Sequence, residues 1–309
     1  MLRSRVRGQV ILGNAVRARL CGATDRSGET MVRFLIAVCI GLSLAGPAAA
    51  DALDDILERG IVKLGVRGSA PPFAYLNVNG EPAGLAVRLC KAVVEFIGEH
   101  QGTRLGLDFT VLDAKQRFPA LINRQTDLHC GPASATLKRR ETLDFSLIYF
   151  VDGAAAAVRP DGDFTTIFET DGGTFGALGG TTTMDVVRDL VKRNNLNVAI
   201  KAFDSHGAGL SELAVGEIEV YFGDQAILFF QIEALKLIDK VNVVEDVLSF
   251  EPYALVMKQG EHRLRLAVDR ALSRIYESGL IYQMILEEMG DYPLSTEAKT
   301  LYLVVGLPE

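Results

Sequence analysis

The sequence has no tryptophan, only four histidines and only four cysteines among its 309 residues. The histidines, His100, His129, His206 and His262, are scattered without the spacing that a metal site requires. A Gly-x-Ser-x-Gly nucleophile motif, a phosphate-binding loop and a dinucleotide fingerprint are also missing. These absences argue against serine-hydrolase, nucleotide and metal chemistry, and we expect no cofactor and no metal.

An apolar run of the roughly 20 residues that a membrane span needs is also missing. A shorter run occupies residues 34–44, preceded by Arg33 and followed by three alanines that end at Ala50. This three-part pattern is typical of a cleaved secretory signal peptide, which predicts a periplasmic protein. The Arg-rich residues 1–30 are either an extended start of that signal or lie before a true start at Met31.

Positive charge is scarce in the part that remains after export. Residues 1–50 hold seven arginines and two acids, so the mature chain has 32 − 7 = 25 basic and 39 − 2 = 37 acidic residues, a net charge of −12. Such a chain repels nucleic acid and anionic lipid, so we expect neither as a partner. An anionic ligand would need a local group of arginines to overcome this background.

The same cleavage would leave only one pair of cysteines, since Cys21 and Cys39 are removed with the signal. Cys90 and Cys130 remain, and two cysteines in an oxidising compartment predict one disulfide. The alternative is a pair of buried free thiols. A disulfide would tie the first long predicted helix to the strand before an arginine-rich loop.

Hydrophobic periodicity predicts two successive βαβαβ units, the order of α/β domains with parallel sheets. In the first unit we expect strands at 61–66, 107–111 and 127–130, a loop at 69–72, and helices at 85–97 and 118–122. In the second we expect strands at 174–178, 198–202, 220–222 and 241–244, with helices at 186–191, 210–214 and 226–237. A strand at 253–257 and helices at 264–276 and 282–289 follow. Two units of about 100 residues predict two lobes.

The expected organisation is a signal peptide over 1–50, lobe 1 over 51–154, lobe 2 over 155–250, a return to lobe 1 over 251–290 and a tail over 291–309. The tail is expected to hold a short helix around 296–304. Two crossing segments, near 151–158 and 249–257, would form a hinge with a cleft between the lobes. Clefts at domain junctions are preferred ligand sites, and hinge closure around a ligand is a common device.

One segment carries a family resemblance. Residues 126–146 read Thr-Asp-Leu-His-Cys-Gly-Pro-Ala-Ser-Ala-Thr-Leu-Lys-Arg-Arg-Glu-Thr-Leu-Asp-Phe-Ser. This resembles the signature of family 3 extracellular solute-binding proteins, the amino-acid-binding components of bacterial ABC importers. Supporting motifs in the same order are Pro71-Pro72-Phe73, Gly84 at a helix start, Gly180-Thr181-Thr182 and Gly223-Asp224. The resemblance implies a two-lobed periplasmic-binding-protein-like fold and a monomer that delivers an amino acid to an importer permease in the inner membrane.

Further motifs resemble the glutamate/aspartate-binding branch of that family. They are Arg67, Gln116-Arg117, Cys130-Gly131, Phe150-Val151-x-Gly153 and Ser205-His206-Gly207. Three positions depart from the pattern: Pro132 stands where a hydroxyl is common, Ala114 stands where this branch tends to have serine, and Gly84-Leu-Ala-Val-Arg88 lacks acids. These departures leave a differently shaped anion or a neutral amino acid open as the ligand.

The resemblance assigns roles to the ends of an amino acid. Arg139 would hold the α-carboxylate by a bidentate pair, with donors from Ser134 and the Gly131 backbone; the alternative is a solvated surface arginine. Asp224 would accept the ammonium, or it would only cap the following helix.

Thr181 and Thr182 would present a helix start to the carboxylate, and Thr181 could cap that helix as well. Arg67, Arg117 and His206 would hold a side-chain carboxylate, although each alone is more often structural. Phe73 would pack against the ligand stem, or it would be a core aromatic.

Two other functions remain open. A dehydratase of the prephenate or arogenate type would use the same fold, with Glu251 as a candidate general acid. A sensing module would report the ligand to a separate membrane partner. The expectation that we carry forward is a binding protein, not an enzyme.

Overall fold

The first of two central sheets organises the N-terminal part of the computed structural model, which describes residues 51–160, 171–244, 246–292, 294, 300–302 and 304–308. Its strand order is β5-β1-β6-β13-β7. The strands are β1 (Ile61–Arg67), β5 (Gly106–Leu112), β6 (Leu128–Cys130), β7 (Leu143–Asp152) and β13 (Glu251–Lys258). Strand β1 is parallel to β5 and β6, whereas β13 is antiparallel to β6 and β7.

Helices surround this sheet because each carries an apolar face. They are α2 (Ala52–Arg59), α3 (Leu85–His100), α4 (Arg117–Ile122), α8 (His262–Glu277) and α9 (Leu280–Met289). In α3 the residues Leu85, Leu89, Val93 and Ile97 recur every four positions and are all buried, which is the pattern of a helix with one face in the core. This packing joins α3, α8 and α9 to one apolar cluster.

The second sheet has the order β10-β9-β11-β8-β12. Its strands are β8 (Ala154–Val158), β9 (Thr174–Leu178), β10 (Ala199–Phe203), β11 (Val220–Asp224) and β12 (Asn242–Val243), and its helices are α5 (Thr182–Arg193), α6 (His206–Val215) and α7 (Gln225–Ala234). Strands β9, β10 and β11 are parallel, and β8 and β12 are antiparallel to their neighbours. Separate apolar clusters lie on its two faces. We call the parts built on the two sheets lobe 1 and lobe 2.

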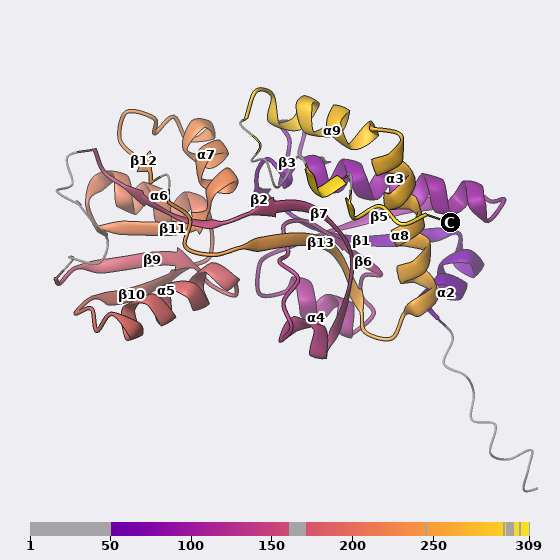
Figure 1. Cartoon of the computed structure of the whole chain (residues 1–309), viewed down its shortest axis with the longest axis horizontal. Helices are drawn as coiled ribbons and strands as arrows, with labels where there is room; N and C mark the ends of the chain where they lie inside the picture. Colours follow the sequence, from indigo (N-terminus) through magenta and orange to yellow (C-terminus); the bar gives the residue numbers. More distant parts are fainter. Residues whose placement is uncertain are drawn as a thin grey trace, which may run out of the picture. The chain divides into compact units, whose positions relative to one another are not determined.

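The chain passes between the sheets at Gly153, directly between β7 and β8. Strands β7 and β13 run side by side as they approach lobe 2 (Figure 1), paired from Glu251 opposite Asp152 onward. A methyl group on Gly153 would lie 2.7 Å from the Ser249 carbonyl oxygen and 2.8 Å from Val247, so the outgoing and returning segments touch. This close approach requires glycine at residue 153.

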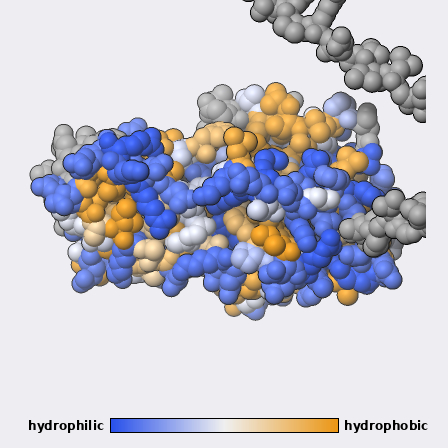
Figure 2. All heavy atoms as spheres, turned by 90° about the horizontal axis from the view of Figure 1, so that it is seen from below, coloured by the Kyte–Doolittle hydropathy of each residue, from blue (hydrophilic) through white to orange (hydrophobic). Residues whose placement is uncertain are grey.

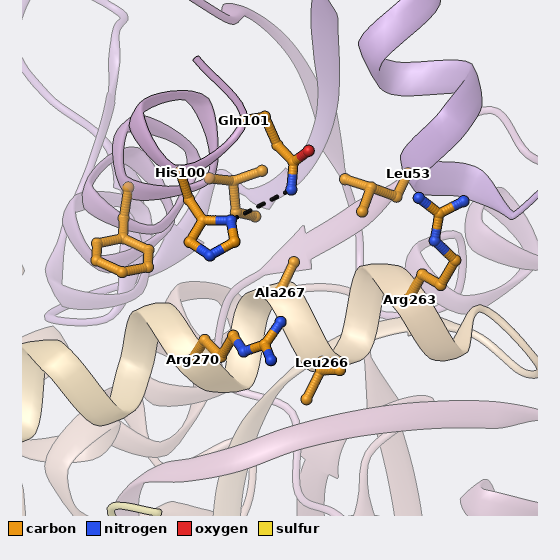
Figure 3. Close-up of a pocket in the computed structure, with 9 residues that line it drawn as sticks. Leu53, His100, Gln101, Arg263, Leu266, Ala267 and Arg270 are labelled. Atoms are coloured by element: carbon orange, nitrogen blue, oxygen red, sulfur yellow. Dashed lines mark hydrogen bonds between the residues drawn. The ribbon is translucent and has the colours of Figure 1, made fainter. Parts of the chain in front are cut away.

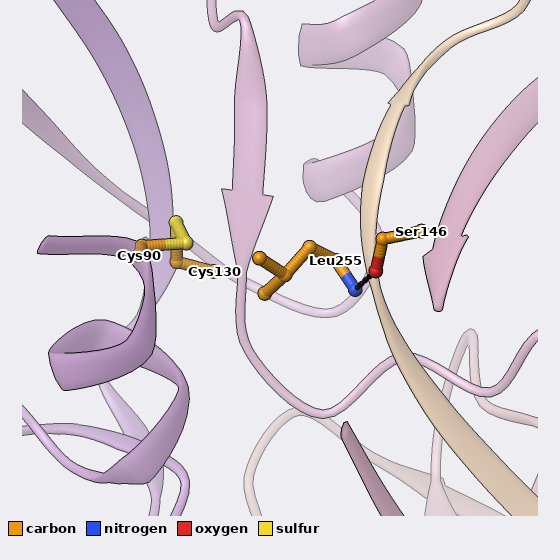
Figure 4. The surroundings of a disulfide bond; sticks show 4 residues. All are labelled: Cys90, Cys130, Ser146 and Leu255. Carbon is orange, nitrogen blue, oxygen red and sulfur yellow. Dashed lines mark hydrogen bonds between the residues drawn. A yellow bond between two sulfur atoms is a disulfide. The ribbon is translucent and has the colours of Figure 1, made fainter. Parts of the chain in front are cut away.

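Cys90 on α3 and Cys130 at the end of β6 form a disulfide (Figure 4), which confirms that prediction. Their Cα atoms are 6.1 Å apart, and both side chains are buried. Nearby, the Leu255 amide of β13 donates to the Ser146 hydroxyl of β7 at 3.0 Å. The covalent tie therefore anchors α3 to the strand that leads into the Gly131 loop.

Several sequence expectations need correction. The sheets are mixed rather than parallel, because the returning β13 and the outgoing β7 and β8 run against their neighbours. Residues 69–72 are not all loop, since β2 (Ser69–Ala70) joins β3 (Ala74–Leu76) and β4 (Pro82–Ala83) in a small sheet. The expected signal peptide and most of the expected tail helix lie outside the described residues, although Thr300 to Tyr302 is helical.

Gly84, which precedes α3, provides a test of this packing. Its φ is +108°, and a methyl group there would lie 2.6 Å from the carbonyl carbon and oxygen of Phe73. We expect Gly84→Ala to lower the free energy of unfolding by about 3 kcal/mol in urea titrations, since backbone atoms must move.

The matched control is Gly102→Ala. Gly102 also has a positive φ, +66°, but nothing lies within 4 Å of the added methyl group. This variant should lose only about 1 kcal/mol. Equal losses in the two variants would show that the contact with Phe73 is unimportant.

Candidate functional site

The carboxyl ends of the parallel strands carry most of the residues that the sequence analysis selected. Arg67 ends β1, Gly131 follows β6, and Asp224 ends β11. Thr181 and Thr182 follow β9 at the start of α5. Ligands of open α/β sheets bind outside the carboxyl ends of the strands, so both sheets direct their functional ends to one site.

An arginine cluster, Arg67, Arg117 and Arg139, forms one side of this site. Arg67 and Arg117 are only 3% and 2% exposed. The guanidinium carbons of Arg117 and Arg139 lie 4.6 and 5.0 Å from the centre of the Phe118 ring, so the two cations share one aromatic side chain. Burial, followed by the charges of Arg67 and Arg139, lowers the pKa of Arg117 well below its ordinary value.

No acid among the described residues forms an ion pair with the cluster, although the charges of Asp113, Asp224 and Glu251 act on it. Within the described ranges, no carboxylate oxygen lies within 4 Å of the three guanidinium groups. In the same part of the chain, Arg67 Nε, Arg117 Nε and Arg117 Nη1 are buried without a hydrogen-bond partner. Buried cations and N–H groups need partners, so this arrangement is that of a site completed by an anion.

Arg139 is positioned differently from a solvated surface arginine. It begins a short 3-10 helix, is half-buried, and its Nη1 donates to the Ser134 carbonyl oxygen at 2.8 Å. Burial lowers its pKa, whereas the charges of Glu251 and Asp224 raise it. The neighbouring Lys138 is exposed, so only one residue of this basic run faces inward.

Two buried histidines lie beside the arginines. Burial and the charges of Arg67 and Arg117 lower the pKa of His206 to about 3, so its ring is neutral at pH 7. Its Nδ1 is 3.2 Å from the Tyr221 hydroxyl. The pKa of His129 is also lowered well below its ordinary value, mainly by burial and then by Arg117 and Arg67.

His129 was not selected from the sequence, although it stands two residues before Gly131 and next to a cysteine of the disulfide. A methyl group on Gly131 would lie 3.0 Å from His129 Nε2 and 3.2 Å from Arg67 Cγ. Glycine therefore lets both His129 and Arg67 pack closely against residue 131.

Acidic and hydroxyl groups form the opposite side. Thr183 Oγ1 donates to Asp224 at 2.5 Å, and the Tyr253 hydroxyl donates to the other Asp224 oxygen. Asp224 stands at the N-cap position of α7, but its side chain makes no capping bond to that helix. Burial, together with the charge of Glu251, raises the Asp224 pKa. Thr183 and Tyr253 were not selected from the sequence, and only their contacts with Asp224 identify them.

Contacts between the lobes surround the same site. Thr182 Oγ1 donates to Glu251 at 2.7 Å and lies 3.4 Å from Ser134 Oγ. Arg117 Nη2 donates to the Gly180 carbonyl oxygen at 3.4 Å. Thr181 caps α5 by accepting from the Met184 amide at 3.2 Å, which confirms its capping role. These contacts place residues of both lobes around the arginine cluster.

Lys115 and Asp204 form an exposed ion pair of 2.7 Å between the lobes. A methyl group on Gly180 would lie 3.3 Å from the Ala114 carbonyl oxygen, so the small residues at both positions allow a close approach. Ala114 therefore contributes its backbone to the contact between the lobes.

Phe73 is fully buried and packs edge-on against Phe150 and Tyr253, with ring centres 4.9 and 5.0 Å apart. These contacts make it part of the lobe 1 core and place it against the ring of Tyr253, whose hydroxyl donates to Asp224. Its contact with a ligand stays a prediction.

The surface also has a pocket outside this site. A pocket lined by Leu53, Phe96, His100, Leu266 and Arg270 lies between α3 and α8 (Figure 3), away from the arginine cluster. Hydrophilic side chains cover much of the face shown in Figure 2, with separate hydrophobic patches.

Within the described ranges, no helix has the length and apolarity to cross a bilayer, and no three His, Cys, Asp or Glu residues form a group able to hold a metal ion.

The pKa of His206 predicts a measurable pH dependence. Between the ordinary pKa of 6.5 and about 3, the unfolded chain binds a proton at this residue and the folded chain does not. The free energy of unfolding therefore falls as the pH decreases through this window. From pH 6.5 to pH 5, His206 should account for a loss of about 2 kcal/mol.

The measurement is urea unfolding of the protein and of His206→Asn at both pH values. The variant should show a correspondingly smaller loss on acidification. An identical pH dependence of the two proteins would show that His206 is not held neutral by its surroundings.

Comparisons with known proteins agree with this architecture. The model of the bacterial extracellular solute-binding proteins, family 3, matches residues 62–289. An L-glutamate/L-aspartate-binding protein of Pseudomonas aeruginosa is 25% identical over 252 residues, covering 80% of this chain and 83% of the relative. A general L-amino acid-binding periplasmic protein of Rhizobium johnstonii is 28% identical over 237 residues, covering 75% of this chain and 69% of the relative.

Solved structures show the same fold. A periplasmic binding protein of Brucella ovis with glutathione bound has a TM-score of 0.67 and 26% identity, covering 82% of this chain and 79% of that one. An ancestral arginine-binding protein bound to arginine has a TM-score of 0.68 and 24% identity, covering 75% of this chain and 99% of that one. Since the family model spans most of the chain, the protein belongs to the bacterial extracellular solute-binding proteins of family 3.

Proposed function

We propose that this protein captures an α-amino acid with a second acidic group in the periplasm and delivers it to an ABC importer. One observation carries the proposal: at a site to which both lobes contribute, three arginines that form no ion pair with a described acid lie close enough to Asp224 for its charge to act on each of them. An amino acid with an acidic side chain has the complementary pattern of two anionic groups and one cation.

The roles follow from the positions of the charges. Arg139 pairs with the α-carboxylate, supported by the Ser134 hydroxyl and the start of α5 at Thr181 and Thr182. Asp224 accepts the ammonium, and a cation placed beside the carboxylate favours its ionised form. Arg67 and Arg117 pair with the second acidic group, and the neutral His206 supplies one further polar contact.

The relatives support an acidic ligand, because one of them is an L-glutamate/L-aspartate-binding protein. We propose binding rather than turnover, and the hydrogen bonds of Glu251 favour this choice. Its two carboxylate oxygens accept from the Thr182 and Ser249 hydroxyls at 2.7 Å each, so this candidate acid acts as an acceptor between the lobes.

The first test is a thermal-shift screen of the exported protein, isolated from the periplasm after expression of the full chain. Bound ligand is removed by unfolding and refolding, and the twenty amino acids and common dicarboxylates are then added. A ligand that binds only the folded state raises the melting temperature. A rise with glutamate or aspartate that exceeds the rise with neutral amino acids supports the proposal.

Two variants separate the carboxylate roles. Arg67→Ala and Arg117→Ala should abolish the response to acidic ligands while any response to neutral amino acids remains. A response to neutral amino acids alone in the unmodified protein would contradict the acidic specificity. Conversion of prephenate or arogenate to an aromatic product would contradict the binding role.

A further inference from the structure

An aromatic contact joins the two lobes outside the arginine cluster. Tyr292 lies shortly after α9 ends at Met289, in lobe 1. Its ring packs against Phe229 and Phe230 of α7 in lobe 2, with ring centres 5.6 and 5.7 Å apart. The family model ends at residue 289, so Tyr292 lies beyond the residues that this model matches. The family match therefore does not explain the contact.

Lobe 1 holds Tyr292 in place from both directions along the chain. Before it, Ile281 and Met284 bury one face of α9 in the lobe 1 core. Beyond it, the Tyr302 hydroxyl donates to the Tyr149 carbonyl oxygen of β7 at 2.7 Å, and the Tyr302 side chain is only 4% exposed. Tyr292 itself is partly buried and packs on the same apolar cluster. We therefore treat Tyr292 as part of lobe 1.

Helix α7 is the lobe 2 partner in this contact. It follows Asp224 directly, at the end of β11. Leu228 and Ile232 of α7 pack in a core cluster of lobe 2. Ala226 and Ile227, at its start, pack in the cluster of lobe 1. A displacement of α7 against lobe 1 therefore also displaces Asp224.

The strand pair β7 and β13 separates this contact from another contact between the lobes. Figure 1 shows α7 and α9 on one side of the two strands, above them in this view, and α4 and α5 on the other side. Arg117 at the start of α4 donates to the carbonyl oxygen of Gly180, which lies just before α5. The paired strands thus run between two sets of contacts that both join lobe 1 to lobe 2.

We propose that β7 and β13 act as the hinge and that Tyr292 is a wedge behind it, which limits how far the cleft opens. A rotation about the strand pair that separates α4 from α5 moves α7 toward α9, since opposite sides of a hinge move in opposite directions. The rings of Tyr292, Phe229 and Phe230 already touch, so a further approach requires that they be displaced. The inference rests on the proposed function in one respect, because it assumes that capture closes the cleft.

Tyr292 is thus a positioning residue, which sets the affinity without touching the ligand. The apparent dissociation constant equals the intrinsic constant divided by the fraction of the protein in the closed arrangement. Removing the ring allows a wider opening, and it also removes aromatic contacts that exist while the lobes touch. Both effects lower the closed fraction and weaken binding.

The test compares the unmodified protein with Tyr292→Ala, both isolated from the periplasm and stripped of ligand by unfolding and refolding. Small-angle X-ray scattering without ligand should give a larger radius of gyration for the variant, because its lobes open further. Calorimetric titration with L-glutamate should show binding that is weaker by about tenfold. At saturating L-glutamate the two proteins should have the same radius of gyration.

Tyr292→Phe is the matched control, because it keeps the ring and removes only the hydroxyl. It should match the unmodified protein in both measurements. Phe229→Ala removes part of the same contact from the lobe 2 side, so it should shift both quantities in the same direction as Tyr292→Ala. The melting temperature of each variant is recorded to show that it folds.

Two results would overturn the inference. An unchanged radius of gyration in ligand-free Tyr292→Ala would show that the ring does not limit opening. Equal effects of Tyr292→Phe and Tyr292→Ala would show that the hydroxyl, not the ring, is responsible. If the unmodified protein does not bind L-glutamate, that result counts against the proposed function, and the scattering comparison without ligand still decides the inference.

Discussion

Arg139→Ala should lose at least about 100-fold in affinity for the amino acid, equivalent to about 3 kcal/mol. The guanidinium is half-buried and held by the Ser134 carbonyl oxygen, so it is oriented before the ligand arrives. Removing it leaves the α-carboxylate in the site without its charged partner, and a buried unpaired charge costs several kcal/mol. Calorimetric titration of the variant with the best ligand from the thermal screen measures the loss.

Lys138→Ala is the matched control for this prediction. Lys138 precedes Arg139 in the same basic run, but its side chain is exposed. Its removal changes the net charge by the same amount while leaving the site intact, so the affinity should stay within about twofold. Similar losses in both variants would show that Arg139 acts only through the general field of the protein.

Replacing both cysteines of the disulfide, Cys90→Ala with Cys130→Ala, should lower the free energy of unfolding by about 4 kcal/mol. The two residues are 40 positions apart, and a crosslink across such a loop restricts the unfolded chain substantially. Both sites are buried, so alanine fills them without adding a polar group. Urea unfolding of the two proteins under non-reducing conditions measures the difference.

A reducing agent supplies the control for the disulfide prediction. It should destabilise the protein to a similar extent once the chain has been unfolded and refolded, and it should have no effect on the double variant. Mass spectrometry that found two free thiols in the exported protein would contradict the prediction. So would a loss of stability below about 1 kcal/mol in the double variant.

Hydrophobic periodicity in the sequence was sufficient to predict the positions of most helices and of the short parallel strands. Strand β1 and helices α3 and α8 appear where the apolar spacing predicted them, because each exposes one face to a single core. Strand β7, by contrast, was missed. Its ten residues cross from lobe 1 toward lobe 2, and their burial does not alternate regularly, since the partner strand β13 changes register twice.

The residues of the functional site also divide into those that the sequence predicted and those that only the structure identifies. Arg139, Arg67 and Arg117 were selected from motifs, but composition alone could not distinguish them from surface arginines such as Arg140. Full burial distinguishes Arg67 and Arg117, and partial burial distinguishes Arg139; in each case burial depends on which elements pack together. Thr183 and Tyr253 could not be selected at all, because they reach Asp224 from positions 41 and 29 residues away in the chain.

The sequence by itself determined the α/β class, the pair of cysteines that form the disulfide and the arginine-containing loop of the family. Each depends on local spacing or on residues close together in the chain. Only the tertiary structure decided that three arginines come together without an ion-paired acid among the described residues, that two neutral histidines lie beside them, and that the charge of Asp224 acts on all three. The physical reason is that charge balance in a buried site is set by distances in space, which strands and helices from two sheets determine together.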